Sequence, residues 1–550
     1  MNSIQKIIEL INQKKFIEAE NIIKYQSNKS NQIFFLDGVI KANQSKFKEA
    51  IKLFELFLHQ DKNHFDANLN LAGCYHEIGE FEKAINYYEK CIDINPHKSE
   101  AFKRLAMCHR FNRDYEKAIN VLEKSLQYEE NKDIILLLGN IFREKGSFEN
   151  AQLYFKKLVD NYPNSFDGKL AIANLEIDKG QLKSAKDQLK NLLSIDEFSI
   201  ESKFQIRMSL AKILIAEGKY HQAIEEYSKL MKIKKNPNIS YNLALCHLFQ
   251  KNYEIGWSYH EDRINLNSFG LLRKRFFNFS KPKWEPNRPK KNLLIWAEQG
   301  IGDVILHSQF LEIIKNDFKN LSLAVDEKLM IFFQKIYPDL NVINIEKISD
   351  FSDYEYHLPI GSMGKNFQKN FNGSILKNKK DYPFENKDIP NKIKKLRCGI
   401  SWKSTNKLFG HKKSILLEQF KNIFMNNEIE FINLQYSYDN LEIEKLEYKL
   451  NKKIFLQHDI DCFEDIDGVA SLIQSCDFVI TVSNSNAHIS GKLGVKTFLL
   501  LPLYDGKLWY WGTNEDKEIP WYPSIIPLRN DKEGNWGDNI SSLINEIEKL

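Results

Sequence analysis

The sequence predicts an N-terminal all-α superhelix over residues 1–260 and, after a basic linker, an α/β domain with two parallel-sheet lobes. Three observations support this fold class. A pattern recurs about every 34 residues in the first half. In the second half, short apolar runs alternate with amphipathic stretches, which is typical of βαβ units. All eight tryptophans lie at or after Trp257, so the composition changes where the repeats end.

The repeats are marked by a small residue at one register. An aromatic residue or leucine precedes it by three positions, and in half of the repeats a glycine precedes it by five. The pattern predicts stacked pairs of amphipathic helices, in which the small residue permits close approach and the glycine forms the turn. It resembles the tetratricopeptide repeat, with about eight helix pairs. The small residues are Ala19, Ala50, Ala84, Ala118, Ala151, Ala185, Ala223 and Gly256.

Two sets of side chains in the repeats have a functional alternative. Cys74, Cys91 and Cys108 are spaced 17 residues apart, as metal ligands could be, but they fall at core positions of alternating helices, which favours packing. Arg110, Asn140 and Arg143 fall at registers that often face the groove of such a superhelix, where a protein partner would bind. A solvated helix face is the alternative for all three.

The composition excludes several classes of protein. The 550 residues carry 78 basic and 73 acidic side chains, and residues 271–291 alone contain eight basic residues and one acidic residue. A nearly neutral chain with one basic strip argues against a general nucleic-acid binder. No apolar run approaches the roughly 18–20 residues of a membrane helix, although the strip could contact anionic headgroups peripherally. Seven cysteines without a C-x-x-C pair do not indicate disulfides, so a cytoplasmic location is expected.

The predicted domain boundaries follow these patterns: repeats over 1–260, linker over 261–291, first lobe over 292–395 and second lobe over 396–550. Strands are expected at 292–297, 321–325, 354–358, 397–402, 430–435, 453–456, 478–482 and 495–501. Helices are expected at 304–317, 416–425, 468–475 and 487–493. The break between the two Rossmann-like lobes is expected in the polar stretch 371–395.

Three strand–helix junctions carry polar residues at the position where α/β sheets bind ligands. The first, AEQGIGDVI, contains Glu298, Gln299, Gly300, Gly302 and Asp303 after a strand. A dinucleotide fingerprint would require a third glycine at position 305, where this chain has isoleucine, so a nicotinamide or flavin cofactor is not expected. Asp303 is either a helix N-cap or an active-site carboxylate.

The second and third junctions lie in the second lobe. A strand ending near residue 402 is followed by Lys403, Lys407, Lys412 and Lys413, a cluster that suits a diphosphate, although each lysine could equally belong to a solvated loop. After the strand at 478–482, small polar residues open a helix and would either cap it or cradle a phosphate. His488 lies in the first turn of that helix, with a packed core histidine as the alternative. The polar residues are Ser483, Asn484, Ser485 and Asn486.

These junctions, in this order, resemble the inverting GT-B glycosyltransferases of the ADP-heptose:lipopolysaccharide heptosyltransferase family, and the whole chain resembles bacterial repeat proteins that carry such a domain. The similar stretches are IWAEQGIGDVI (295–305), ITVSNSNAHISGKLG (480–494), IPWYPSIIPLR (519–529) and the junction YEIGWSYHEDR (253–263). The family commonly has Asp-Thr where this chain has Ser483-Asn484, and an arginine where it has Lys413.

The resemblance implies a metal-independent transfer of sugar from a nucleotide-sugar to a protein or cell-surface glycan. Asp303 would be the general base, and Lys413 and the 483–488 turn would hold the donor phosphates, with Lys403 nearby. No metal or cofactor is expected. The Asp-x-Asp pairs at 459–461 and 465–467 imitate a metal motif but precede a helix, which favours capping. The alternative function is a non-catalytic scaffold whose GT-B domain is degenerate and mediates protein–protein interaction.

Overall fold

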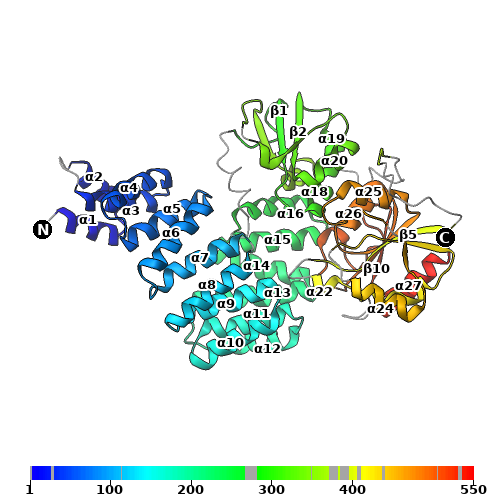
Figure 1. The fold of residues 1–550 in the computed structure, drawn as a ribbon, viewed down its shortest axis with the longest axis horizontal. Helices are drawn as coiled ribbons and strands as arrows, with labels where there is room; N and C mark the ends of the chain where they lie inside the picture. The colour runs from blue at the N-terminus through cyan, green and yellow to red at the C-terminus, as the bar shows by residue number, and fades with distance from the viewer. Residues whose placement is uncertain are drawn as a thin grey trace. The chain divides into compact units, whose positions relative to one another are not determined.

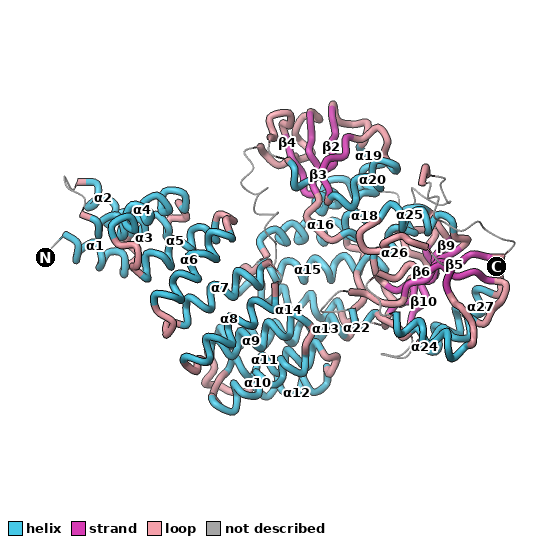
Figure 2. Tube along the Cα trace, in the orientation of Figure 1, coloured by secondary structure: helices cyan, strands magenta, loops and turns pink. Residues whose placement is uncertain are grey.

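The computed structural model describes residues 3–25, 30–112, 114–266, 281–348, 350–370, 382–384, 395–405, 410–436, 440–456, 458–503, 506–530 and 536–550. These residues belong to two compact units. The first unit holds the helices up to residue 181. The second holds the helices from Leu182 to Leu266 and both β-sheets (Figures 1 and 2).

The first unit consists of antiparallel helix pairs, as the repeat pattern predicts. Each second helix begins at the residue three positions before the small residue, for example α6 at Phe81 and α10 at Phe148, and the small residues Ala84 and Ala151 are completely buried. The helices are α1 (Ser3–Asn12), α2 (Phe16–Lys24), α3 (Asn31–Asn43), α4 (Phe47–Gln60), α5 (Phe65–Glu77), α6 (Phe81–Ile94), α7 (Ser99–Phe111), α8 (Tyr115–Tyr128), α9 (Lys132–Lys145), α10 (Phe148–Asn161) and α11 (Phe166–Asp178).

The turn within each pair requires a left-handed backbone conformation. Gly79 and Gly146 occupy it with φ of 86° and 83°. Where the sequence has no glycine at this register, Ser45 and Lys14 adopt the same conformation with φ of 60°. The turn geometry is therefore common to pairs that lack the glycine, at a steric cost to the non-glycine residue.

A second glycine register sets the distance between paired helices. A Cβ on Gly139 of α9 would lie 2.3 Å from Cε1 of Phe155, a fully buried ring on α10. Gly139→Ala is therefore expected to lower the free energy of unfolding of the first unit by about 1–3 kcal/mol, the usual cost of overpacking. Faster amide hydrogen exchange in α9 and α10 would measure this loss.

Gly73→Ala is the matched control, because Gly73 also lies inside a first helix but has open surroundings. Its added Cβ would approach no atom closer than 3.7 Å, the distance to Nη1 of Arg104. Alanine should stabilise that helix by up to about 1 kcal/mol through its higher helix propensity. Equal effects of the two substitutions would contradict the close-approach explanation.

The second unit begins with the remaining repeats. Their helices are α12 (Leu182–Leu193), α13 (Ile200–Ala216), α14 (Tyr220–Ile233), α15 (Pro237–Phe249) and α16 (Tyr253–His260), followed by the 3₁₀ helix η1 (Glu261–Asn265). Up to His260 the described residues contain sixteen α-helices, the number that eight predicted helix pairs require. The three cysteines of the 17-residue series, Cys74, Cys91 and Cys108, are buried free thiols in the helical core.

The first lobe is a four-stranded parallel sheet in the order β3-β2-β1-β4. Trp284 of the linker packs on this lobe, with its ring stacked on Phe367 at 5.4 Å, while the predicted linker residues 267–280 lie outside the described residues. The elements are β1 (Asn292–Trp296), α18 (Ile301–His307), η2 (Ser308–Phe310), α19 (Leu311–Ile314), β2 (Asn320–Val325), α20 (Glu327–Ile336), β3 (Asn341–Asn344), η3 (Ile345–Lys347), β4 (Tyr356–Pro359), η4 (Ile360–Ser362), α21 (Met363–Phe367) and η5 (Gln368–Asn370).

The second lobe is a six-stranded parallel sheet in the order β10-β9-β8-β5-β6-β7. The predicted break at 371–395 separates the two sheets, although only residues 382–384 and 395 of it are described. The elements are β5 (Leu396–Ser401), α22 (Gly410–Lys413), η6 (Leu417–Phe420), α23 (Lys421–Phe424), β6 (Ile429–Asn433), α24 (Asn440–Leu450), β7 (Phe455–Leu456), α25 (Ile466–Ser475), β8 (Phe478–Val482), α26 (Ser485–Leu493), β9 (Lys496–Leu501), η7 (Trp509–Trp511), β10 (Ile525–Arg529) and α27 (Gly537–Ile547).

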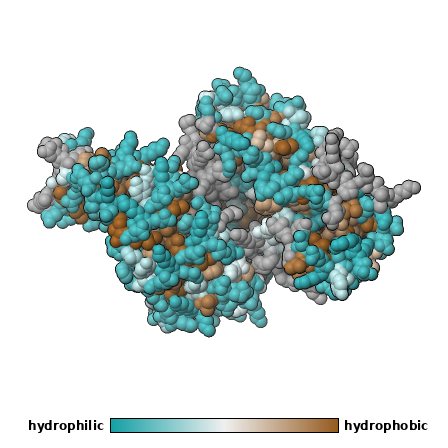
Figure 3. Space-filling view, in the orientation of Figure 1, coloured by the Kyte–Doolittle hydropathy of each residue, from teal (hydrophilic) through white to brown (hydrophobic). Residues whose placement is uncertain are grey.

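On the face seen in Figure 3, hydrophilic residues predominate among the described residues and apolar residues appear in separate patches. Within the described ranges, none of the helices has both the length and the apolar character needed to cross a membrane.

Candidate active site

In each sheet the strand order reverses at one point, and this point indicates where a ligand would bind. In the first lobe, β2 and β3 lie on one side of β1, whereas β4 lies on its other side. In the second lobe β5 lies between β6 and β8 in the same way. Ligands of open α/β sheets bind at the carboxyl ends of the strands at such reversals. All three predicted junctions follow one of these strands.

The helices that follow β1 and β8 pack directly against each other. Gly302 of α18 lies against the ring of His488 of α26, and a Cβ on Gly302 would be 2.7 Å from Cδ2 of that ring. His488 is 3% exposed, and its Nδ1 lies 2.9 Å from the hydroxyl of Tyr522. Burial, together with the nearby Lys413 and His307, lowers the pKa of His488 to about 3. His488 is thus a neutral, packed histidine, which agrees with the alternative considered from the sequence.

Asp303 and Lys413 come from different lobes and interact electrostatically. Asp303 lies half-buried in the first turn of α18, whose N-cap is Gly300, so the N-cap alternative for Asp303 is not the one found. Lys413 ends the short helix α22 and is 4% exposed. Burial lowers the pKa of Lys413 to about 8, although the Asp303 carboxylate acts in the opposite direction. The site therefore combines a carboxylate with a lysine whose proton is unusually easy to remove.

Two tyrosines surround the same carboxylate. Tyr510 and Tyr522 are buried, and the pKa of each is raised well above its ordinary value, mainly by burial and in part by the negative charge of Asp303. They belong to an aromatic cluster with Trp509, Trp511 and Trp521. The cluster is packed within the protein: Trp509, Trp511 and Trp521 are also less than 9% exposed.

The polar side chains after β8 bind other parts of the protein. Asn484 caps α26 by accepting from Asn486 N, and its Nδ2 donates to Ser401 Oγ at 3.1 Å and to Lys403 O at 3.2 Å. Nδ2 of Asn486 donates to Leu434 O at 2.7 Å. These amides join the carboxyl ends of β5, β6 and β8. Ser483 Oγ accepts from Trp511 Nε1 at 2.8 Å, and Ser485 is half-buried at the start of α26.

Lys403, which follows β5, also binds other residues of the protein. The ammonium of Lys403 pairs with Glu442 of α24, and its backbone N donates to Gln435 Oε1 at 2.7 Å. Gln435, which is fully buried after β6, donates its amide to Lys403 O and Tyr436 O. Lys407 lies outside the described residues. Lys413 interacts electrostatically with Asp303.

Glu298 has a structural partner that sequence reasoning missed. Its side chain is completely buried and receives hydrogen bonds from Arg263 of η1 at 2.8 and 3.2 Å. Its neighbour Gln299 lies close to Gly361, where a Cβ would be 2.6 Å from Gln299 Nε2. The signal for Arg263 was its place in the junction motif at 253–263, but nothing in the spacing indicated Glu298 as the partner.

The Asp-x-Asp pairs act as caps and ion-pair partners. Asp465 Oδ1 accepts from Gly468 N at the start of α25, and Asp461 accepts from Phe463 N. Asp467 pairs with Lys335 of α20 at 2.8 Å. In the described part of the chain, no group of three His, Cys, Asp or Glu side chains could hold a metal ion.

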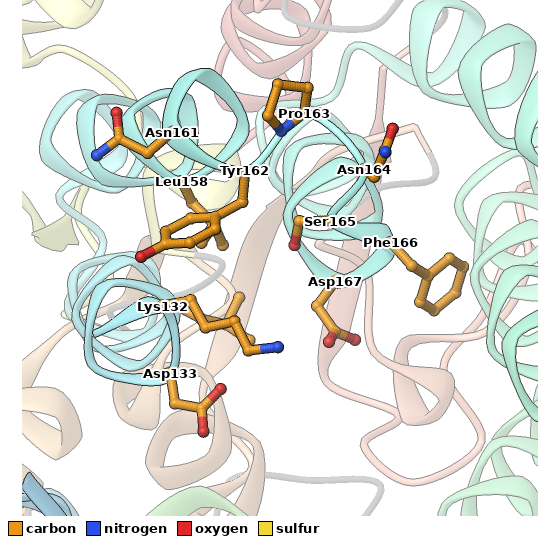
Figure 4. Close-up of a pocket in the computed structure, with 11 residues that line it drawn as sticks. Lys132, Asp133, Leu158, Asn161, Tyr162, Pro163, Asn164, Ser165, Phe166 and Asp167 are labelled. Atoms are coloured by element: carbon orange, nitrogen blue, oxygen red, sulfur yellow. The ribbon is translucent and has the colours of Figure 1, made fainter. Parts of the chain in front are cut away.

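Two cavities lie away from these residues. One of about 490 Å³ is in the first unit and is bordered by the start of α9, the end of α10 and the start of α11; Figure 4 shows Lys132 and Asp167 pointing toward each other across it. The other, about 380 Å³, lies in the second unit beside Trp284 and Lys365.

The arginines predicted to face the groove form ion pairs between successive repeats, Arg110 with Glu144 and Arg143 with Asp178.

Family models of the tetratricopeptide repeat match residues 63–131, 133–165 and 204–237. The N-terminal part of the chain consists of tetratricopeptide repeats. Tetratricopeptide repeats indicate protein partners, and all three matches precede the two sheets. No protein in the curated set matches the sequence.

Two solved structures resemble the chain over part of its length. A tetratricopeptide repeat protein from Parabacteroides merdae is 20% identical, covers 45% of this chain and 99% of its own, with a TM-score of 0.38. PilW, titled a type IV pilus biogenesis factor, is 21% identical and covers 38% of this chain and 94% of its own, with a TM-score of 0.31. Likenesses at this level carry no inference about function.

Proposed function

We propose that the two-lobed part of the second unit is a GT-B glycosyltransferase that moves a sugar from a nucleotide-sugar to a protein or cell-surface glycan acceptor. The observation that carries this proposal is the electrostatic interaction of Asp303 with Lys413, each supplied by a junction after the strand at which its own sheet reverses order. The tetratricopeptide repeats would recruit the acceptor or another protein.

In the proposed reaction, Asp303 takes the proton of the acceptor hydroxyl. The acceptor oxygen then forms a bond to the anomeric carbon as the bond from that carbon to the donor phosphate breaks, which inverts the configuration. The nucleoside diphosphate leaves with the electron pair. Lys413 and the positive end of the α26 helix dipole stabilise its negative charge, so the residues can support the departure without a metal.

The competing proposal is a non-catalytic scaffold. It is favoured because several second-lobe side chains already bind other residues of the protein. The amides of Asn484 and Gln435 donate to residues at the ends of strands, and Lys403 forms an ion pair with Glu442. A donor would have to be held mainly by Lys413 and backbone N–H groups. In this case the repeats would still bind a protein, and the two lobes would serve as a second docking module.

A panel of ADP-, UDP-, GDP- and CMP-sugars separates the two proposals. We expect one of them to bind to the full chain in calorimetry and to be slowly hydrolysed without an acceptor, because water can replace the acceptor hydroxyl. Failure of every donor to bind at millimolar concentration would reject the enzyme. Binding without hydrolysis or transfer to any acceptor would favour the scaffold.

The pKa of Lys413 predicts how binding depends on pH. The ammonium is charged below about pH 8 and loses its proton above it. Since only the charged form attracts a diphosphate, the affinity for ADP, UDP or GDP should be higher at pH 7 than at pH 9 and fall by up to about tenfold per pH unit above pH 8. Titration calorimetry at several pH values measures this.

Lys413→Met is the matched variant for the pH experiment, because it keeps the buried chain and removes the charge. Its affinity should be weaker than that of the native protein at pH 7 and should not change between pH 7 and 9.5. A native affinity that stays constant through pH 9.5 would show that Lys413 does not contact the diphosphate.

A further inference from the structure

The end of the repeat array contacts both lobes of the α/β domain. On the second-lobe side, Lys251 Nζ lies 2.5 Å from Asp516 Oδ1, and the ring of Trp257 meets Trp509 edge-to-face at 5.2 Å. On the first-lobe side, Nε1 of Trp257 donates to Gln368 Oε1 at 3.0 Å. The last helix pair is therefore packed as a part of the two-lobed domain.

Arg263 connects the end of the helical region to the loop after β1, where the strand order of the first sheet reverses. It is 2% exposed, and its Nη2 donates to Glu298 Oε1 at 2.8 Å and to Ser362 Oγ at 3.1 Å. Nη1 donates to the carbonyl of His260 and to Glu261 Oε1. The planar guanidinium thus binds the loop after β1, the segment after β4 and its own 3₁₀ helix at once, a geometry that lysine cannot reproduce.

Glu298 is the shared acceptor of these hydrogen bonds. Its Oε1 also accepts from Gly361 N at 3.0 Å, so a single carboxylate oxygen joins the residues that follow β1 and β4. A Cβ on Gly361 would lie 2.4 Å from that oxygen, which leaves no room for a side chain. Asp303 lies five residues after Glu298 on the same short connection.

We propose that Arg263, contributed by the 3₁₀ helix η1 that directly follows the last repeat, is a positioning residue that fixes the segment 298–303 and so couples the repeats to the candidate active site. Removing either partner of a buried ion pair leaves an uncompensated charge, and the segment must then rearrange or admit water. The effect on transfer rests on the proposed function, whereas the effect on the segment does not.

Amide hydrogen exchange of the full chain tests the positioning directly. In Arg263→Lys, exchange of the amides at 299–304 should accelerate by about tenfold or more, because one point charge replaces the fork. Amides of β2, two strands away from β4 in the same sheet, should change by less than about threefold. Glu298→Gln should give the same local pattern, since it keeps the shape and loses the charge.

Lys290→Gln serves as the control, because it removes an exposed ion pair with Asp317 in the same lobe. It should leave exchange at 299–304 unchanged. If Arg263→Lys and Glu298→Gln leave the segment as protected as in the native protein, or loosen the whole sheet equally, Arg263 is not a positioning residue. Both outcomes can be read without any donor.

The kinetic readout applies once a donor is known. Arg263→Lys should lower kcat by about tenfold or more while the KM for the donor stays within about threefold, because the donor is held mainly by the second lobe. An equal effect on kcat and KM, or a loss in KM alone, would reject the coupling even where the local exchange pattern holds.

Discussion

Asp303→Asn is expected to reduce sugar transfer by about 10²–10⁴-fold, the usual contribution of a general base. Asparagine keeps the size and hydrogen-bonding capacity of the side chain but cannot accept the acceptor proton. Binding of the nucleoside diphosphate should survive when it is measured below pH 7, where the Lys413 ammonium keeps most of its charge although the loss of the Asp303 carboxylate lowers the pKa of Lys413 further. Transfer rate and nucleotide affinity are therefore measured on the same variant.

Asp317→Asn is a suitable control for this substitution, since Asp317 is an exposed carboxylate of the same lobe. It should transfer sugar at the native rate. Transfer by Asp303→Asn within about threefold of the native rate would remove Asp303 from the role of base. Loss of nucleotide binding or of folding in that variant would instead make Asp303 a structural residue.

Trp257→Ala is expected to lower the free energy of unfolding of the second unit by about 3–5 kcal/mol. Trp257 is 1% exposed, packs against Trp509 and against Gly364, and satisfies Gln368 with its indole N–H. Alanine would leave a cavity between the last repeat and both lobes, together with an unpaired amide. Tryptophan fluorescence during denaturant unfolding reports this unit alone, because the first unit contains no tryptophan.

Ile255→Ala, two residues away on α16, is the matched control for the cavity. Ile255 is 48% exposed, so its truncation should change the free energy of unfolding by no more than about 0.5 kcal/mol. Trp257→Phe should fall between the two, since it keeps an aromatic ring and loses the hydrogen bond. Similar unfolding midpoints for Trp257→Ala and Ile255→Ala would show that the last repeat does not stabilise the two lobes.

The repeats could be predicted closely because their determinants are local. The residue three positions before each small residue is the first residue of the second helix in every pair, from Phe16 to Tyr253. The turns within the pairs could be predicted less completely, because the sequence marks them only where glycine occurs. Lys251 has φ of 60° at the same register, which only the backbone reveals.

The central strands could also be predicted, whereas two edge strands were missed. The strand expected at 478–482 is found at the same residues as β8, because a fully buried strand is a continuous apolar run. β3 is short and carries two asparagines, and β10 contains Pro527. Both lie at sheet edges, where a weak apolar pattern or a proline is tolerated.

The candidate site was predictable in its positions but not in its pairings. Strand-end junctions are visible in the sequence, so the neighbourhood of Asp303 and Lys413 could be expected from fold rules. The partners of Glu298 and Lys403 are long-range: Arg263 is 35 residues away and Glu442 is 39 residues away. Spacing along the chain does not specify such tertiary contacts, so the partners of these side chains are visible only in the structure.

The contact between the last repeat and the C-terminal aromatic cluster also bears on the order of folding during synthesis. The helix pairs of the first unit are stabilised by neighbours within a few tens of residues, so they can form as the chain leaves the ribosome. Lys251 and Asp516 are 265 residues apart. Trp257 must therefore wait for Trp509 to be made before its surface is covered, and during that interval the nascent chain exposes an apolar helix face that a chaperone would recognise.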